Sequence, residues 1–408
     1  MKYAVLLGDG MTDYPVDELG GKTPLEYART PNMDRMAAEG TLGLVDTIPK
    51  GFTPGSDVAN LSVLGYNPEL YYTGRGPLEA ASMDVRLGLN DVAFRCNLVH
   101  LGADYEVMDS FNADHISSEE AKELIAALND AIGSESVRFY PGVGYRHLMV
   151  WSGGSVLIET TPPHDIVGQG IETHLPRGVG SESVRTLMER SRDTLKDHPV
   201  NHERTRNGKR TANSIWLWGQ GRAPEMDPMT KKYSIKGGMI SAVDLLNGIG
   251  VYAGLDIISV PGATGYIDTN YLGKAEKALT FLEGNDFVFI HVEAPDEMGH
   301  EGNIEGKVRA IEDFDAKIVG TVLNGMTAFE DYRVIVLSDH PTPIIVKTHT
   351  SDPGPFAVYS SRSGENMATG LLFNEKAARQ SGIIIAPGHI LMDTFIVKWA
   401  KFIEKQGI

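Results

Sequence analysis

Residues 287–300 read FVFIHVEAPDEMGH, and this stretch joins an apolar strand to two candidate metal ligands. Its first part, residues 287–292, is almost continuously apolar, which is typical of a strand covered on both faces of a parallel sheet. Asp296 and His300 follow the predicted end of that strand. Because they are four residues apart, they share one face of a helix and suit a common cation.

Two other segments repeat this pattern of an apolar strand followed by polar side chains. Asp9 follows the strand predicted over residues 3–8, and Asp339 and His340 follow the strand predicted over residues 333–337. The carboxyl ends of parallel strands lie along one edge of an open sheet, where ligands bind. We therefore expect these side chains to converge in space.

The ligand types indicate divalent metal ions. His349, in the turn-rich stretch KTHTSDPGP, adds another imidazole. Carboxylates and imidazoles without a thiolate suit Mn²⁺, Zn²⁺ or Mg²⁺. The adjacent Asp339 and His340 would project in different directions, so they could serve two neighbouring ions. Two such ions about 4 Å apart would clamp the attacking and leaving oxygens of a phosphoryl transfer.

The stretch GFTPGSDVANLSVLGY, residues 51–66, places Ser56 at the head of a short apolar helix. One interpretation is a helix cap, because a serine at that position accepts a hydrogen bond from a free backbone N–H. The other is a nucleophile, since a helix N-terminus holds anions and a neighbouring cation eases deprotonation of the hydroxyl. The predicted metal ligands favour the nucleophile. Neither a G-x-S-x-G elbow nor a P-loop is present to suggest another mechanism.

Composition limits the class of protein. The chain has 408 residues, 42% of them hydrophobic and 22% charged, enough for two globular domains. Its net charge of -17 argues against nucleic acid or an anionic membrane as a partner. A lone cysteine, Cys96, excludes an internal disulfide and suits a reducing cytoplasm; we expect it to be a buried small hydrophobe. Apolar runs stay well short of the ~20 residues of a membrane span.

The pattern of elements predicts an α/β fold with an insertion. We interpret residues 1–92 and 219–408 as a discontinuous core with a mostly parallel sheet flanked by helices. Residues 93–218 change to short strands and turns, and we interpret them as a smaller α+β domain that binds substrate as a lid. Helices are expected from Pro31 to Gly40, with Thr30 as cap, and over residues 118–129, 303–322 and 390–405. Ser117 and Glu120 should form a capping box at the second of these.

Basic residues are candidates for holding an anionic substrate. Arg95 and Arg146 stand among apolar residues, where an unpaired charge would be costly, so we expect them to contact substrate. His147 lies beside Arg146 in the sequence. The run HERTRNGKR, residues 202–210, is expected to be a solvated surface. Arg75 and Lys236 could reach a phosphate or cap a helix, and His164 could bind substrate or occupy a turn. The substrate-binding candidates are therefore Arg75, Arg95, Arg146, His147, His164 and Lys236.

Seven motifs together resemble the cofactor-independent phosphoglycerate mutases of the shorter, archaeal type, within the alkaline phosphatase superfamily. They are LLGDG, PGSDVANLSVLGY, YTGRGPLEAAS, AFRCNLV, HVEAPDEMGHEG, LSDHPTP and HTSDP. The resemblance extends over nearly the whole chain and implies an alkaline-phosphatase-like core, a serine phosphorylated during turnover, two metal ions and an inserted domain that closes over substrate. By motif, one ion would be held by Asp9, Ser56, Asp339 and His340, and the other by Asp296, His300 and His349.

The resemblance implies a 2,3-bisphosphoglycerate-independent mutase of glycolysis and gluconeogenesis, which moves phosphate between the 3- and 2-hydroxyls of glycerate through Ser56. Three departures, SDHPTP, HTSDP and Asn60 in place of a frequent histidine, resemble a bacterial subgroup proposed to act as homoserine kinases. The alternative is therefore phosphate transfer from a nucleotide to homoserine with the same serine and metals. A metal-dependent phosphatase is less favoured, because a lid excludes water.

Overall fold

The computed structural model describes residues 1–102 and 104–406 and divides into two compact units. Unit 1 comprises residues 1–72 and 225–408, and unit 2 comprises residues 73–224. Unit 2 begins earlier than the expected insertion at residue 93. The reason is that helix α5 (Arg75–Ser82) packs on strand β3 (Asp91–Gly102), where Ala80 joins a small apolar cluster with Ala93.

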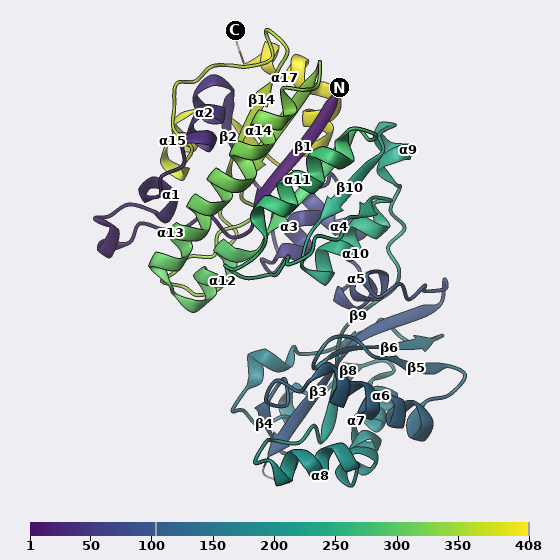
Figure 1. The fold of residues 1–408 in the computed structure, drawn as a ribbon. Helices are drawn as coiled ribbons and strands as arrows, with labels where there is room; N and C mark the ends of the chain where they lie inside the picture. The colour runs from purple at the N-terminus through teal and green to yellow at the C-terminus, as the bar shows by residue number, and fades with distance from the viewer. Residues whose placement is uncertain (103, 407–408) are drawn as a thin grey trace. The chain divides into compact units, whose positions relative to one another are not determined.

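Unit 1 is built on an eight-stranded sheet in the order β11-β10-β12-β1-β13-β14-β2-β15 (Figure 1). The three strands expected from the sequence form its centre. β1 (Lys2–Gly8) pairs in parallel with β12 (Phe287–Val292) on one side and β13 (Tyr332–Leu337) on the other. β14 (Gly354–Ser360) runs antiparallel to both of its neighbours. The predicted α/β fold with a mostly parallel sheet is thus confirmed. The outer strands are β2 (Thr41–Val45), β10 (Gly237–Ile240), β11 (Asp256–Ile257) and β15 (Ile384–Ile385).

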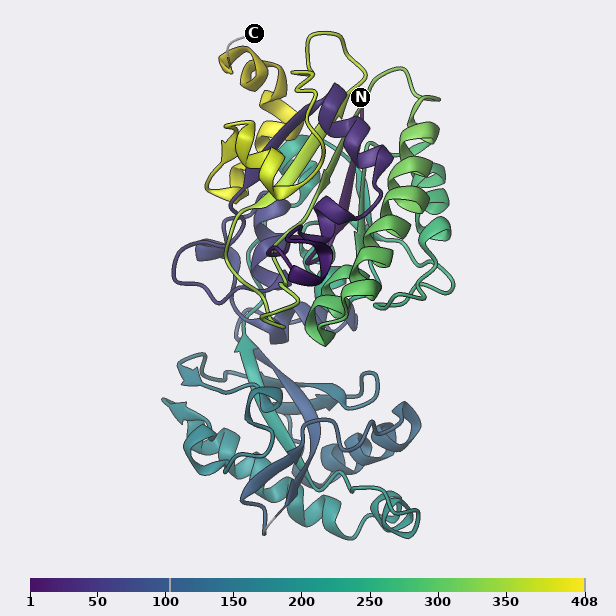
Figure 2. The same cartoon turned by 90° about the vertical axis from the view of Figure 1, so that its left-hand side faces the viewer.

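Helices cover both faces of this sheet, as the two views show (Figures 1 and 2). Ala4 and Leu6 of β1 point to the face that carries α2, α11, α13 and α14. On the other face, the Tyr3 ring meets Phe395 edge-on at 5.7 Å. Each fully buried aliphatic or aromatic side chain contributes about 1.5–3 kcal/mol, so packing on both faces stabilises the sheet. The helices on the face of Ala4 and Leu6 are α2 (Pro31–Glu39), α11 (Tyr271–Leu282), α13 (Ile304–Asp313) and α14 (Gly320–Met326).

Most helix boundaries follow the sequence signals. α2 ends before Gly40 as expected, although the Thr30 side chain makes no capping hydrogen bond. α6 (Ser118–Ile132) begins with the predicted capping box between Ser117 and Glu120. The helices expected over residues 303–322 and 390–405 are each interrupted by a π-helical segment, and they continue as α14 and as α17 (Trp399–Lys405). Among the described residues, no helix combines the length and apolar character needed to cross a membrane.

Unit 2 is an antiparallel sheet in which β3 pairs with β6 (Arg146–Ser152) and β9 (Ser214–Gly221). α6 and α7 (Ser181–Lys196) pack on one face, whereas α5 lies on the other. Alternation along the strands separates the side chains: Arg95 faces the α5 side, and Cys96 faces the core, where it is fully buried as expected. The same sheet includes β4 (Val107–Ser110) and β5 (Val137–Tyr140), whereas β7 (Ile158–Glu159) and β8 (Arg177–Gly178) form a separate two-stranded sheet.

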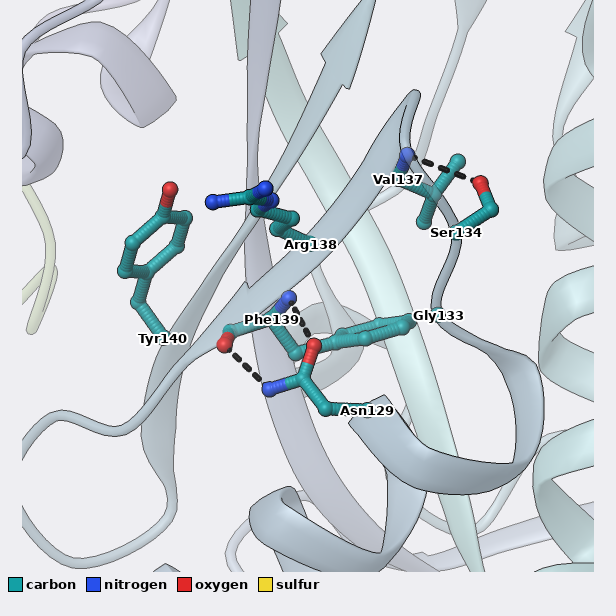
Figure 3. A pocket seen from close by; sticks show the side chains of 7 residues that line it. All are labelled: Asn129, Gly133, Ser134, Val137, Arg138, Phe139 and Tyr140. Carbon is teal, nitrogen blue, oxygen red and sulfur yellow. Dashed lines mark hydrogen bonds between the residues drawn. The ribbon is translucent and has the colours of Figure 1, made fainter.

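A surface pocket of unit 2 lies between α6 and β5 (Figure 3). Asn129 of α6 accepts a hydrogen bond from the Phe139 N–H at 2.8 Å and donates one to the Phe139 carbonyl at 2.6 Å. These two bonds attach the end of α6 to the edge strand. The lining is made of residues other than the candidates named above, so this pocket is separate from the predicted site. It is lined by Asn129, Gly133, Ser134, Val137, Arg138, Phe139 and Tyr140.

Candidate active site

Three groups of ligand-type side chains lie at the carboxyl-end edge of the sheet in unit 1. Within each group the potential ligand atoms lie within 4.8 Å of one another. Two of the groups contain the residues expected from the sequence, and the third contains two residues that were not singled out. The first group is Asp296, His300 and His349; the second is Asp9, Asp339 and His340; the third is Asp9, His291 and Glu293.

The first group is arranged like a set of metal ligands. Asp296 and His300 lie one turn apart on α12 (Ala294–Glu301), with 3.1 Å between Oδ2 and Nε2. The Nε2 atoms of His300 and His349 are only 2.9 Å apart. Their Nδ1 atoms lie next to the backbone carbonyls of Lys347 (3.1 Å) and Pro54 (3.3 Å). When each Nδ1–H donates to its carbonyl, the two Nε2 lone pairs face each other, and a shared cation relieves their repulsion.

The second group is fully buried. Asp9 directly follows β1, and its Oδ1 lies 3.4 Å from Nε2 of His340. Asp339 Oδ2 lies 3.7 Å from the same nitrogen. Asp339 Oδ1 accepts hydrogen bonds from the backbone N–H groups of Gly10 (3.1 Å) and His340 (3.0 Å). Although neighbours on a strand point in opposite directions, Asp339 and His340 lie beyond the end of β13, and both contribute to one group.

Ser56 lies beside this second group. α3 (Ser56–Val63) begins at this serine, because Gly55 is the extended N-cap residue and Val58 and Leu61 anchor the helix in the core. Ser56 is the first residue of the helix and does not occupy the N-cap position. Its Oγ instead lies 3.2 Å from Nε2 of His340. The geometry therefore supports the nucleophile interpretation over the cap.

The electrostatics of the site require positive charge. Burial raises the pKa of Asp9 well above its usual range, and the neighbouring carboxylates of Asp339, Glu293 and Asp296 raise it further. Oδ1 of Asp9 is buried and has no hydrogen-bond partner among the described residues. Buried carboxylates this close are stable only when protonated or bound to cations. The donor set, oxygen and imidazole nitrogen, fits divalent metal ions.

Two polar residues that the sequence did not identify as functional orient the ligands. Asn60, one turn after Ser56, donates hydrogen bonds from Nδ2 to Asp339 Oδ2 (2.8 Å) and to the Ser56 carbonyl (2.9 Å). The Thr342 hydroxyl donates to Asp296 Oδ1. Such partners fix the direction of a ligand's lone pairs. The four-residue spacing from Ser56 is the signal that could have identified Asn60.

The third group was missed for a different reason. His291 lies inside the apolar run of β12, where a single polar residue reads as part of a buried strand. Glu293 comes directly after that strand, in the position that pointed to Asp9 after β1. Applying the same rule to every strand end would have found Glu293.

Unit 2 contains a basic and aromatic cluster on the face of its sheet covered by α5. The Arg95 guanidinium stacks 4.5 Å from the Trp218 ring centre, and Arg75 approaches the same ring at 5.9 Å. His164 meets Trp218 edge-on at 5.4 Å. Arg146, which points to the same face, lies 5.8 Å from the Tyr145 ring. Cationic side chains on aromatic rings favour an anionic ligand.

The sequence interpretation assumed that Arg95 has no charged partner, but the structure provides one. Its Nε lies 3.4 Å from Oε1 of Glu79, with both side chains 12% exposed. Burial lowers the pKa of Arg95, Glu79 opposes this, and the nearby Arg75 and Arg146 lower it further. Glu79 therefore partners Arg95, and the positive charges of Arg75 and Arg146 lie close enough to act on the same guanidinium group.

His147 points away from this cluster. It lies opposite Cys96 on the core face of the sheet, and its Nδ1 accepts the Gly142 N–H at 3.0 Å. Burial lowers the pKa of His147 to about 3, so the ring is neutral. The sequence placed it beside Arg146, but successive strand residues point to opposite faces.

Lys236 lies at the wrong edge of unit 1 to join the metal-type groups. It is exposed and immediately precedes β10, and its carbonyl accepts hydrogen bonds from Asp286 and Phe287 at the start of β12. The ligands cluster where β12 ends. A parallel strand of this length separates the two edges by roughly 20 Å.

The run at residues 202–210 is only partly a solvated surface. Arg204 is 1% exposed, and its guanidinium binds Glu120 Oε2 at 2.7 Å and the carbonyls of Arg210 (2.8 Å) and Ala113. This arginine joins α8 (Pro199–Arg206) to the capping box of α6. The expectation of a solvated surface is therefore wrong for Arg204.

Comparisons with known proteins give one family. The model for 2,3-bisphosphoglycerate-independent phosphoglycerate mutase matches residues 37–201. A probable 2,3-bisphosphoglycerate-independent phosphoglycerate mutase of Geobacter sulfurreducens is 54% identical, covering 97% of this chain and 100% of the relative. A 2,3-bisphosphoglycerate-independent phosphoglycerate mutase of Methanosarcina acetivorans is 55% identical, covering 90% and 92%.

Two solved structures are similar over nearly the whole chain. A protein from Pyrococcus horikoshii has a TM-score of 0.83 and 28% identity, covering 100% of this chain and 98% of that one. A cofactor-independent phosphoglycerate mutase from Thermoplasma acidophilum has a TM-score of 0.67 and 27% identity, covering 98% and 100%. Both units therefore fall within the region of similarity.

Proposed function

Because this chain belongs to the family of 2,3-bisphosphoglycerate-independent phosphoglycerate mutases, we propose that it interconverts 3-phosphoglycerate and 2-phosphoglycerate through a phosphoserine at Ser56. The observation that carries the proposal is the position of Ser56 Oγ, 3.2 Å from His340 beside a buried set of carboxylates and imidazoles. A hydroxyl there is placed to attack phosphorus. The single cysteine supports a cytoplasmic enzyme. The basic cluster of unit 2, with Arg75 and Arg95 beside Trp218, supports a small phosphorylated hydroxy acid as the substrate.

Two divalent ions, Mn²⁺, Mg²⁺ or Zn²⁺, fit the first two groups and would supply charge stabilisation to the transferring phosphate. The first group would hold one ion. The second group, together with Ser56, would hold the other. Asn60 and Thr342 keep these ligands oriented through their hydrogen bonds to Asp339 and Asp296. The site is thus preorganised for charge that develops during transfer.

The transfer balances without a further reactant. Ser56 Oγ forms a bond to phosphorus as the bond from phosphorus to the 3-oxygen of glycerate breaks. Ser56 loses its hydroxyl proton and the released 3-oxygen gains one. The 2-hydroxyl of the same glycerate then attacks the phosphoserine and loses its proton, the bond from phosphorus to Oγ breaks, and Ser56 Oγ regains a proton. Backbone N–H groups at the start of α3 stabilise the phosphate while it is attached to Ser56.

We assign substrate binding to the basic cluster of unit 2. Arg75, Arg95 and Arg146 offer planar guanidinium groups that suit the carboxylate and phosphate of a phosphoglycerate. His164 meets the same Trp218 ring as two of these arginines and belongs to the cluster. His147, on the opposite face of the sheet, and Lys236, at the amino-end edge of unit 1, are not part of this assignment.

The decisive experiment distinguishes three reactions on one preparation. The full chain is stripped of metal, reloaded with Mn²⁺ or Mg²⁺, and incubated with 3-phosphoglycerate alone, and the products are followed by ³¹P NMR. We expect 2-phosphoglycerate to form without added 2,3-bisphosphoglycerate and without release of inorganic phosphate. Failure to form 2-phosphoglycerate in the loaded, folded protein contradicts the proposal.

Parallel incubations address the other reactions. ATP with homoserine would give phosphohomoserine if the chain were a kinase, and inorganic phosphate would accumulate if it were a phosphatase. The two relatives compared above carry the mutase name, so we expect neither product. Phosphohomoserine formed in place of 2-phosphoglycerate would reassign Ser56 and the metal-type groups to transfer from a nucleotide.

A further inference from the structure

Lys307 and Asp13 form a buried ion pair outside the three ligand groups, and they have no part in the transfer described above. Both side chains are fully buried, with 2.7 Å between Nζ of Lys307 and Oδ2 of Asp13. We propose that this pair is a positioning device for two chain segments that carry ligands: residues 9–14, which follow β1, and residues 338–344, which follow β13. The proposal rests on the metal sites of the proposed function, but its test is a metal-binding constant and does not require turnover.

Lys307 reaches both segments from α13, which belongs to neither. Its Nζ donates to Asp13 Oδ2 in the first segment and, at 2.8 Å, to the Thr342 carbonyl in the second. The Thr12 carbonyl, at 3.5 Å, is a weaker third acceptor. All three hydrogens of the ammonium group therefore have acceptors, and they join the two segments to one helix.

Asp13 joins the same segments in the opposite direction. Its carboxylate accepts the Ile344 N–H, which lies 3.2 Å from each oxygen, and its Oδ1 accepts the Tyr14 N–H at 2.7 Å. The N–H of Asp13 in turn donates to Oε1 of the buried Glu375 at 3.0 Å. Without the ammonium group, the Asp13 carboxylate would lose its ion-pair partner, and an uncompensated charge in the interior is costly. We therefore expect loss of Lys307 to displace the segments.

Both segments contact ligands of the metal-type groups. The Gly10 N–H donates to Asp339 Oδ1 at 3.1 Å, and the Thr342 hydroxyl donates to Asp296 Oδ1. Gly10 has a φ of 60°, and a Cβ at this position would lie 2.5 Å from Asp296 Oδ1. Ligands and segments are thus closely packed, so a small movement of either segment changes the spacing of the ligand atoms. Partners of metal ligands typically affect metal affinity by about 10–100-fold.

A second buried ion pair of unit 1 provides a matched comparison. Arg333 Nη2 lies 2.6 Å from Oε2 of Glu365, and the two side chains are 4% and 11% exposed. Arg333 lies near the start of β13, so roughly 20 Å of extended strand separates it from Asp339. Loss of one partner from either pair should destabilise the fold. Only the loss of Lys307 should also weaken metal binding.

The test measures Mn²⁺ affinity in variants of the full chain. Protein stripped with a chelator is titrated with Mn²⁺, and the free ion is followed by electron paramagnetic resonance. In Lys307→Met the Kd for Mn²⁺ should rise about tenfold or more, whereas in Arg333→Met it should stay within about twofold of the value for the unaltered protein. At saturating Mn²⁺, Lys307→Met should show a lower kcat and an unchanged KM for 3-phosphoglycerate, because the basic cluster of unit 2 is unaltered.

Two results would overturn the proposal: an unchanged Mn²⁺ affinity in folded Lys307→Met, or an equal loss of affinity in Arg333→Met. If Lys307→Met does not fold, Asp13→Asn takes its place, because asparagine keeps the shape of the side chain and removes the charge. Weaker Mn²⁺ binding by Asp13→Asn supports the role of the pair, and unchanged binding excludes it. Weakened Mn²⁺ binding by these variants of a chain that forms no 2-phosphoglycerate would contradict the proposed function and leave the role of the pair intact.

Discussion

The strand-end site of unit 1 and the basic cluster of unit 2 are built in opposite ways. In unit 1, Asp9, Asp339 and His340 are fully buried, and backbone N–H groups and strand ends fix their positions. In unit 2, long arginine side chains stack on aromatic rings, and Arg146 is exposed. The first arrangement holds ligand atoms to a narrow geometry, whereas the second adapts to an anion.

This difference predicts how each region fails when it is altered. Changes at the strand ends should abolish the chemical step or metal binding. Changes in the basic cluster should weaken substrate binding and leave metal content intact. Kinetic constants and metal counts, measured on the same variants, separate the two.

The largest effect is expected for Ser56→Ala. Removal of the nucleophile should lower kcat on the order of 10⁴-fold or more, with the fold retained and the ion of the second group left with Asp9, Asp339 and His340 as its ligands. The conversion of 3- to 2-phosphoglycerate, followed by ³¹P NMR, measures it. Ser62→Ala is the control on the same helix. Among the described residues the Ser62 hydroxyl donates to the Thr47 carbonyl at 2.6 Å, so its loss should cost about 1 kcal/mol of stability and little activity. Near-normal turnover by Ser56→Ala would disprove the phosphoserine mechanism.

Arg204→Met should give the largest loss of stability among these variants. It distinguishes Arg204, an arginine with a structural role in unit 2, from the arginines of the basic cluster. It removes the ion pair with Glu120 and the bonds to two carbonyls, at a cost of about 3 kcal/mol. A lowered thermal midpoint with unchanged KM is expected. Arg206→Met, at an exposed site of the same helix, should shift stability by less than about 0.5 kcal/mol. Equal midpoints for the two variants would contradict the structural role of Arg204.

A smaller, kinetic effect is expected for Arg95→Lys. Lysine keeps the charge but loses the planar fork and the stacking on Trp218, so KM for 3-phosphoglycerate should rise about tenfold, or ~1.4 kcal/mol. Steady-state kinetics with a metal count on the same sample measure it. A fall in kcat with unchanged KM would instead place Arg95 in the transition state and weaken the contrast between the two regions.

Lys236→Ala should have almost no effect. This lysine is exposed at the amino-end edge of the sheet, so stability should change by less than about 0.5 kcal/mol and kinetic constants should stay the same. A several-fold rise in KM would restore Lys236 as a substrate residue.

The sequence was sufficient for the sheet and for the convergence of its acidic strand ends. Continuous apolar runs predict buried parallel strands, and the geometry of such a sheet brings Asp9, Asp296 and Asp339 to one edge whatever their separation along the chain. The capping box at Ser117 was predicted from four neighbouring residues in the same way. These features depend on short stretches of chain and on one general rule of sheet geometry.

What the sequence did not reveal depends on contacts between distant side chains. Arg204 reads as one more charge in a basic run, but its partners at Glu120 and Ala113 are supplied by another helix and loop. In the sequence, Asn60 and Thr342 resemble other polar residues. Their roles follow from hydrogen bonds to Asp339 and Asp296, which form only in the folded chain. The sequence also did not show which face of the sheet each side chain occupies. The strand register places His147 and Arg146 on opposite faces.

The position of β1 has a consequence for the order of folding during synthesis. This first strand of the chain pairs with β12 and β13, so that Tyr3 lies opposite Phe287 and Arg333. Pairing of this central strand on both sides must therefore wait until β13, which ends at Leu337, has been synthesised, whereas unit 2, residues 73–224, is continuous and can form earlier. A nascent chain can thus complete unit 2 before the strand-end groups of unit 1, whose residues come from both sides of unit 2 in the sequence.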